Sequence, residues 1–167
     1  MTVVSTILLS TPSVVVADVI ETTDGGERTA PGSCATLAFV YRGVFVRHVG
    51  DELIVGEPNQ VLFFNAGEAH RIAHPLAEGA AYLLLEIEAA LLREIAPPKI
   101  LHQDAPLRFT LGRLRIDPRA QALVAMLRYS LRENIAEPLE AESLALTLAQ
   151  RALGPRPTHA AGASASM

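Results

Sequence analysis

The stretch GEPNQVLFFNAGEAHRIAHP, residues 56–75, places two histidines four residues apart behind a short apolar run. Its polar side chains include Asn65, Glu68, His70 and His74, which combine imidazole nitrogens with a carboxylate and an amide. Imidazole and carboxylate groups bind transition metals, and a few such polar groups also fix ligands in apolar pockets. A plain hairpin is the third interpretation, in which the closing His-Pro pair ends a strand and sets a turn.

The preceding run LAFVYRGVFVRHV, residues 37–49, has two alternating faces. One face carries Leu37, Phe39, Tyr41, Gly43, Phe45, Arg47 and Val49, and the other carries Ala38, Val40, Arg42, Val44, Val46 and His48. Either face brings an arginine to a mostly apolar surface, and a buried arginine needs an anion from the protein or from a ligand. A surface arginine or a salt bridge within the domain is the simpler alternative. A bulge near Gly43 would exchange the two faces, so the pattern leaves open which one lines an interior.

Short β-rich runs separated by turns fill residues 3 to about 87, a pattern typical of a sandwich or barrel. The first 20 residues are apolar but lack a basic start and contain Pro12, so they predict one or two strands rather than a signal or membrane segment. A barrel mouth is a common ligand site. The candidates for such a pocket are Tyr41, Arg47, His48, Phe63, Asn65 and His70.

Helical periodicity replaces the β pattern after residue 88. AALLREIA predicts a short helix that the following Pro-Pro pair stops, and LRFTLGRLRI stays ambiguous. DPRAQALVAMLRYSLRENIAE predicts a long helix capped by Asp117, and PLEAESLALTLAQRAL predicts another that starts at Pro138. Their apolar surface must pack within the domain or against a second copy. The residues expected at these contacts are Leu123, Leu127, Leu131, Leu146 and Leu153.

Net charge, cysteine content and the absence of known catalytic motifs limit the functions that the chain could have. The formal net charge is −4, without a broad basic surface, so this chain alone is a poor nucleic-acid binder. Cys34 is the only cysteine, which rules out an internal disulfide and suits a reducing compartment. It has no basic neighbour in the sequence to activate it, so we interpret it as a small thiol at a strand start. The sequence contains no Gly-rich phosphate loop, Ser-His-Asp order or paired-carboxylate motif.

The order of strands and then helices, with FVYRGVFVRHVGDELIVGEPNQVLFFNAGEAHRIAHP in the middle, resembles the N-terminal cupin domain of AraC-type transcription regulators. The resemblance continues into DPRAQALVAMLRYSLRE and EPLEAESLALTLAQRAL, and it covers about residues 33–153. It implies a cupin-like antiparallel β-barrel, a double-stranded β-helix, followed by two or three α-helices. The expected divisions are a sensor barrel over 1–96, connecting helices over 97–153, and a flexible tail or truncated linker over 154–167.

The function implied by this resemblance is sensing of a small-molecule effector of unknown identity and homodimerisation. DNA would be bound only through helix-turn-helix units that this sequence does not include. The resemblance implies a cytoplasmic protein that is not an enzyme and has no cofactor and no membrane partner. Its mechanism would be a population shift, with residues 1–20 as a candidate moving arm. A stand-alone dimeric protein that pairs with full-length regulators is a further alternative.

Comparison with the two histidine motifs of cupins defines a metal alternative. NAGEAHRIAH is similar to the second motif, with His70 at its histidine position. VRHVGDE is similar to the first, keeping His48 and Glu52 but placing Val46 where the first histidine belongs. His48, Glu52 and His70 would then form a two-histidine, one-carboxylate set for Fe(II), Mn or Zn in an isomerase or dioxygenase. Regulators of the AraC type commonly carry an aromatic residue in place of His70 and do not generally use metal.

Overall fold

A computed structural model describes residues 3–22, 28–29, 35–102 and 107–154 of the chain. Cys34 and the predicted tail beyond Gly154 therefore lie outside the described residues. The described elements follow the chain in the order β1 (Val3–Ser10), β2 (Val14–Glu21), β3 (Arg28–Thr29), β4 (Thr36–Gly43), β5 (Phe45–Val49), β6 (Glu52–Gly56), β7 (Gln60–Phe64), β8 (Ala69–Ala73), β9 (Ala80–Ile87), α1 (Ala89–Ile95), β10 (Leu101–His102), β11 (Arg108–Phe109), β12 (Arg113–Arg115), α2 (Pro118–Arg132) and α3 (Pro138–Leu153).

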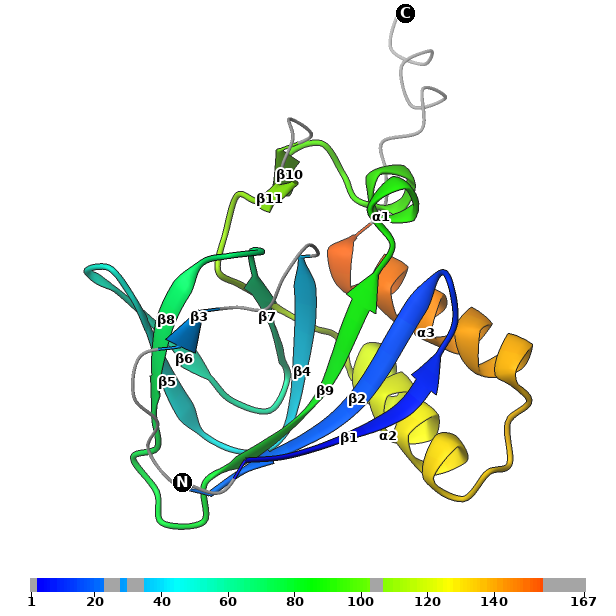
Figure 1. Cartoon of the computed structure of the whole chain (residues 1–167), viewed down its shortest axis with the longest axis horizontal. Coiled ribbons are helices and arrows are strands. Elements are labelled where there is room, and N and C mark those ends of the chain that lie inside the picture. The colour runs from blue at the N-terminus through cyan, green and yellow to red at the C-terminus, as the bar shows by residue number, and fades with distance from the viewer. Residues whose placement is uncertain (1–2, 23–27, 30–34, 103–106, 155–167) are drawn as a thin grey trace, which may run out of the picture.

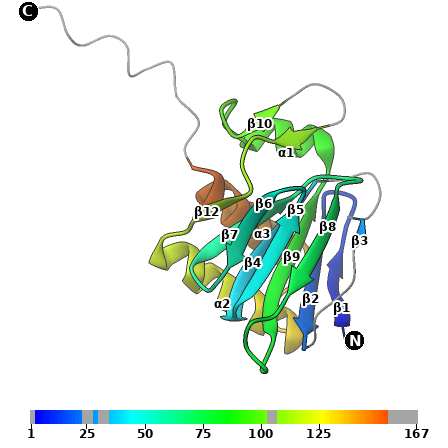
Figure 2. The same cartoon turned by 90° about the vertical axis from the view of Figure 1, so that its left-hand side faces the viewer.

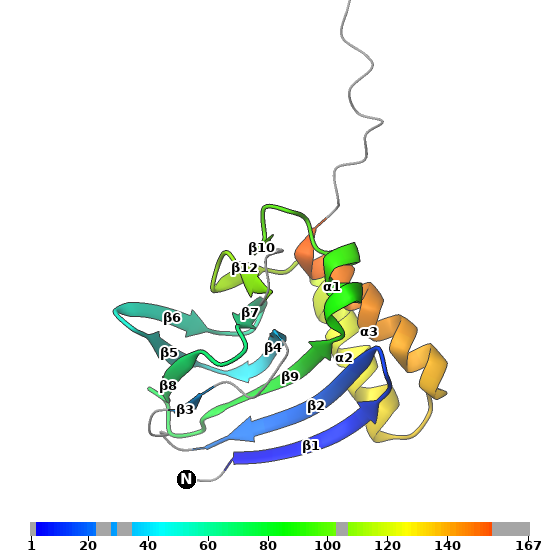
Figure 3. The ribbon, with the colours of Figure 1, turned by 45° about the horizontal axis from the view of Figure 1, so that its top comes forward.

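The described strands pair antiparallel and form two main sheets that face each other (Figures 1 and 3). The larger sheet has the order β1-β2-β9-β4-β7-β12, and the smaller has the order β3-β8-β5-β6. Helices α2 and α3 lie against the outer face of the larger sheet (Figure 2). The barrel and C-terminal helices expected from the sequence are therefore confirmed. No helix in the described part of the chain is long and apolar enough to cross a bilayer.

A barrel core fills the space between the two sheets, and the bulge at the end of β4 determines which side chains enter it. Ala38 and Val40 of β4 point inward, but the register against β9 shifts between Val40 and Arg42. Inward positions in β5 are consequently Phe45 and Arg47. The exchange of faces that the sequence left open does occur here. The apolar members of this core are Ala17, Val19, Ala38, Val40, Phe45, Ile54, Leu62, Phe64, Ile72, Ala80 and Tyr82.

A second core, the helix core, lies between the outer face of the larger sheet and the three helices. The buried positions of α2 are Ala120, Val124, Leu127 and Leu131, which recur at helical spacing. Asp117 caps this helix as expected, because its Oδ1 accepts the backbone N–H of Ala120 at 2.7 Å. Of the residues expected at helix contacts, Leu127, Leu131 and Leu153 are buried in this core, and Leu123 and Leu146 are partly buried against it.

The N-terminal segment is part of the larger sheet. β2 pairs along its whole length with β9 on one side and with β1 on the other. β1 is the edge strand, and most of its side chains are exposed. Within the candidate moving arm, β2 is thus fixed between two neighbours, and β1 alone lies at an edge from which movement would break only one ladder.

Candidate functional site

Arg47 is a fully buried charged residue inside the barrel, with 1% of its surface exposed. Its Nη1 donates to the carbonyl oxygen of Phe63, and its Nη2 donates to Oε1 of Glu68, both at 2.5 Å. The guanidinium carbon lies 4.0 Å from the centre of the Phe64 ring, a cation–π arrangement. No described residue accepts a hydrogen bond from the buried Nε. Burial lowers the pKa of Arg47, and the charge of Glu68 opposes that shift.

Arg47 lines a cleft of about 180 Å³ where β5, β6 and the end of β7 meet residues 108–112. We call this the barrel-mouth cleft. Its charged side chains are Arg47, Arg108, Glu52 and Glu68, so two positive groups face two negative ones. The remaining lining residues are Val49, Ile54, Phe63, Asn65, Phe109, Thr110, Leu111 and Gly112. The balance of charge suits a small polar molecule that both donates and accepts hydrogen bonds and carries no net charge.

Asn65 joins the barrel to the segment that closes this cleft. Its Oδ1 accepts the backbone N–H of Phe109 at 2.8 Å, and its Nδ2 donates to Oε2 of Glu68 at 3.3 Å. The Phe109 ring stacks on Phe63 with centroids 4.3 Å apart. Arg108 Nη2 lies 3.7 Å from the same Glu68 carboxylate. The position of residues 108–112 therefore depends directly on the polar groups of the cleft.

The six predicted pocket residues lie in four places. Arg47, Phe63 and Asn65 come together in the barrel-mouth cleft. His70 is buried on the inner face of β8, with its ring edge toward Phe64 at 5.2 Å and its Nδ1 3.4 Å from the Glu68 carbonyl oxygen. His48 is half-buried on the outward face of β5, opposite Leu53 and Arg71. Tyr41 lies on the other side of the larger sheet, facing α2.

Tyr41 belongs to a charged cluster between the sheet and α2, which we call the Asp18 cluster. Asp18 on β2 has only 3% of its surface exposed. Its Oδ1 accepts the Tyr41 hydroxyl at 2.5 Å, and its Oδ2 accepts Arg128 Nε at 3.0 Å and Arg132 Nη1 at 2.7 Å. The Arg128 guanidinium carbon lies 4.4 Å from the centre of the Tyr41 ring. Burial, followed by the hydrogen bond and charge of Asp18, raises the pKa of Tyr41 to about 12.

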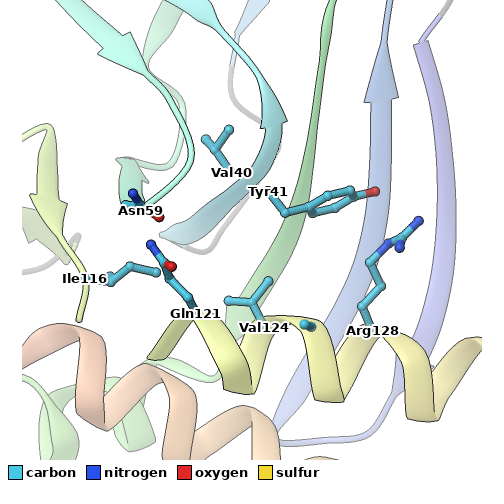
Figure 4. A pocket seen from close by; sticks show the side chains of 8 residues that line it. Val40, Tyr41, Asn59, Ile116, Gln121, Val124 and Arg128 are labelled. Carbon is cyan, nitrogen blue, oxygen red and sulfur yellow. The ribbon is translucent and has the colours of Figure 1, made fainter. Parts of the chain in front are cut away.

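Beside this cluster lies a larger cleft of about 370 Å³, the helix cleft, between β4 and α2 (Figure 4). Its lining is Val40, Tyr41, Asn59, Ile116, Gln121, Val124, Ala125 and Arg128. Figure 4 shows the Gln121 amide rising from α2 toward Asn59, while Arg128 extends beside the Tyr41 ring. The sequence did not predict this cleft, because its two walls are separated by about 80 positions in the chain.

Residues 22–149 match the family described as the AraC-like ligand binding domain. The chain belongs to this family. No curated protein matches it significantly. This AraC-like domain is similar to a solved cupin superfamily protein of Desulfitobacterium hafniense DCB-2, at 22% identity over 52% of this chain and 77% of that chain, with a TM-score of 0.42. It is also similar to the Cupin_2 domain of an XRE family transcriptional regulator from Enterobacter cloacae, at 15% identity over 53% and 98% of the chains, with a TM-score of 0.44.

The metal set that the cupin motifs suggested is not assembled in this AraC-like domain. Within the described ranges, no three His, Cys, Asp or Glu side chains come close enough to hold a metal ion. His48 alternates with Arg47 along β5 and so points outward, whereas Glu52 lines the barrel-mouth cleft on the inner side. His70 also lies on the inner side. Strand alternation therefore separates His48 from Glu52 and His70 in this structure.

A second buried polar group inside the AraC-like barrel escaped the sequence analysis. Glu21, at the end of β2, accepts the Tyr82 hydroxyl at 3.1 Å, and its other carboxylate oxygen lies 3.4 Å from His74 Nε2. The His74 imidazole was assigned only to a turn after a strand, yet it is buried against this carboxylate. The available signal was the position of Glu21 at the end of a mostly apolar strand.

Proposed function

We propose that this AraC-like domain senses a small molecule and dimerises within a cytoplasmic transcription regulator, without catalysing a reaction. The helix-turn-helix units that it controls would be carried elsewhere in that regulator. Membership of a ligand-binding domain family supports the sensing role. The cytoplasmic location is supported by the single cysteine.

The effector would bind in the barrel-mouth cleft. One observation carries this proposal. The Nε of Arg47 is buried in the barrel and has no hydrogen-bond acceptor among the described residues. A buried donor without a partner costs free energy, and a ligand that accepts from it removes that cost. Asn65 and Arg108 extend the set of donors and acceptors to the cleft rim. A neutral polar molecule fits the equal numbers of positive and negative side chains.

A short stretch of chain would couple ligand binding in the barrel-mouth cleft to the position of α2. Residues 108–112 line the cleft and lead directly into β12, which pairs with β7. Ile116 and the cap Asp117 follow, and α2 begins at the next residue. A ligand that prefers one arrangement of residues 108–112 would therefore bias the position of the α2 start, which is a population shift.

A thermal-shift screen of small neutral polar compounds tests the binding part of this proposal. A true effector raises the melting temperature in proportion to the logarithm of its concentration. Arg108→Ala should weaken binding, measured by calorimetry, at least about tenfold because it removes a charged donor at the rim. Arg115→Ala, an exposed arginine outside the cleft, is the matched control and should bind as the wild type does. Equal binding by both variants would place the ligand elsewhere.

Exposed apolar side chains on the α2–α3 hairpin support dimerisation. Met126 and Tyr129 are exposed one turn apart on α2, Ile135 is exposed in the connection, and Leu139 at the start of α3 is 79% exposed. Several exposed large apolar residues on one hairpin are consistent with an interaction surface. The regulator role can be tested by fusing the chain to a helix-turn-helix domain that binds its operator only as a dimer. Operator binding by the fusion is expected, and a monomeric fusion that leaves the operator free would contradict the proposal.

A further inference from the structure

The helix cleft contains polar groups that the proposed sensing mechanism does not use. Asn59 and Gln121 place side-chain amides at one end of the cleft, and Arg128 places a guanidinium at the other (Figure 4). Neither amide has a hydrogen-bond partner among the described residues. Between the two ends, Ile116 and Val124 present apolar surface. A volume of about 370 Å³ lies within the roughly 300–1,000 Å³ range of small-molecule sites.

The charge beside this cleft is not balanced. Asp18 provides one carboxylate, whereas Arg128 and Arg132 provide two guanidinium groups that both bind its Oδ2. The Tyr41 hydroxyl donates a hydrogen bond to the same carboxylate and stays neutral, so it offers no negative charge. The cluster therefore has one positive charge in excess. Arg128 uses only Nε to bind Asp18, and no described residue accepts from its terminal amino groups. A guanidinium with both terminal groups available is suited to a carboxylate ligand.

We propose that the helix cleft is a second ligand site, which binds a small, compact organic monocarboxylate. The terminal amino groups of Arg128 donate to the carboxylate, and the apolar body packs on Ile116 and Val124. The Gln121 amide at the far end recognises a polar substituent if the ligand has one. This site lies on the opposite side of the larger sheet from the barrel-mouth cleft. Its ligand is negatively charged, whereas the barrel-mouth cleft favours a ligand without net charge.

Such a ligand would contact the barrel and α2 at once. Val40 and Tyr41 belong to β4, whereas Gln121, Val124 and Arg128 belong to α2. Occupancy would therefore hold α2 against the larger sheet and stabilise the arrangement seen in this structure. The inference does not depend on an effector at the barrel mouth, since the two clefts have no lining residue in common.

The test uses cyclohexanecarboxylate as the probe and the uncharged cyclohexanecarboxamide as its isostere. The full chain, labelled with nitrogen-15, is titrated with each compound while backbone amide shifts are recorded by NMR. The expected result is saturable binding of the carboxylate with the largest shifts at residues 121–128, and at least about tenfold weaker binding of the amide. Equal affinity for the two compounds would overturn the assignment of a carboxylate ligand. Carboxylate shifts centred on residues 108–112 would overturn the second site and place the anion at the barrel mouth.

Two matched substitutions on α2 locate the site independently. Ala125 lines the cleft and Ala122 does not, and both are exposed on the helix. Ala125→Leu fills the cleft and should weaken carboxylate binding at least about tenfold, whereas Ala122→Leu should change it less than about twofold. Both variants keep a strong helix former, and melting curves confirm that each is folded. Unchanged binding by Ala125→Leu would overturn the proposal.

Discussion

The carboxylate of Asp18 and the guanidinium of Arg132 lie 2.7 Å apart, although 114 positions separate them in the chain. Asp18 belongs to β2 in the larger sheet, and Arg132 is the last residue of α2. Arg128 binds the same carboxylate oxygen one turn earlier in the helix. The Asp18 cluster is therefore a polar connection between the barrel and the C-terminal end of α2, opposite the end that Asp117 caps.

Asp18→Asn should destabilise the domain by about 1.5–3 kcal/mol, measured by chemical denaturation followed by circular dichroism. The substitution removes the negative charge that two arginines share. The loss stays below the roughly 3–5 kcal/mol typical of a broken buried pair, because Arg128 and Arg132 are 32% and 48% exposed and can turn to water. Asp51→Asn, at an exposed turn, is the control and should change stability by less than about 0.5 kcal/mol. Equal effects of the two substitutions would refute the cluster's contribution.

Tyr41 should make stability depend on pH in the alkaline range. Its folded-state pKa is raised from 10.0 to about 12, so the protein favours the protonated phenol that donates to Asp18. A raised pKa contributes stability that is complete below pH 10 and is lost as pH rises from 10 to 12. The stability advantage of wild type over Tyr41→Phe should therefore shrink across this window. Denaturation curves of both proteins at pH 8, 10 and 12 measure it, and a constant difference would contradict the assignment.

Glu68 should stabilise the barrel mainly by neutralising Arg47. Glu68→Gln leaves the buried guanidinium without its anion and should cost about 2 kcal/mol in the free energy of unfolding. Adding Arg47→Met removes the orphaned charge and fills its space, so the double variant should be more stable than Glu68→Gln alone. Glu78→Gln on the surface is the control. A double variant less stable than the single one would show that Arg47 stabilises the barrel without Glu68.

Gly43 should be far less replaceable than Gly50. Both have positive φ, at 74° and 56°, which costs a non-glycine residue about 1 kcal/mol. A Cβ on Gly43 would also clash with the backbone of Gly79, whereas a Cβ on Gly50 meets no atom within 4 Å. Gly43→Ala should therefore destabilise by about 3 kcal/mol or more, and Gly50→Ala by about 1 kcal/mol. Similar melting temperatures for the two variants would contradict this account.

Local patterns were sufficient to predict the barrel strands up to residue 87 and the three helices. The Asp117 cap and the Pro-Pro stop lie within a few residues of the helix ends they mark. Gly43 indicated a bulge, and the bulge explains why Arg47 faces inward while His48 faces outward. The order of the strands brought Arg47, Phe63 and Asn65 together.

The sequence pattern could not predict contacts between side chains that are far apart in the chain. Asp18 stands out in an apolar strand, but its arginine partners lie more than 100 positions later on a helix face whose orientation only packing determines. Arg108 was missed because LRFTLGRLRI is too short and mixed to assign, and it forms two small strands. The separation of His48 from Glu52 and His70 could not be predicted, because motif spacing does not report which face of a bulged strand a histidine occupies.

Leu139→Glu should abolish the proposed dimer. Leu139 is the most exposed large apolar residue of the described chain, and Met126, Tyr129 and Ile135 are the other exposed large apolar residues of the α2–α3 hairpin. A glutamate there suits the first turn of α3 but places a charge in an apolar interface, so the monomer should keep its fold while the dimer dissociates. Light scattering should fall from the dimer mass to the 17.9 kDa monomer. Leu53→Glu, at a 62% exposed position on β6, is the control and should remain dimeric. Dissociation by Leu53→Glu alone would instead place the interface on the smaller sheet.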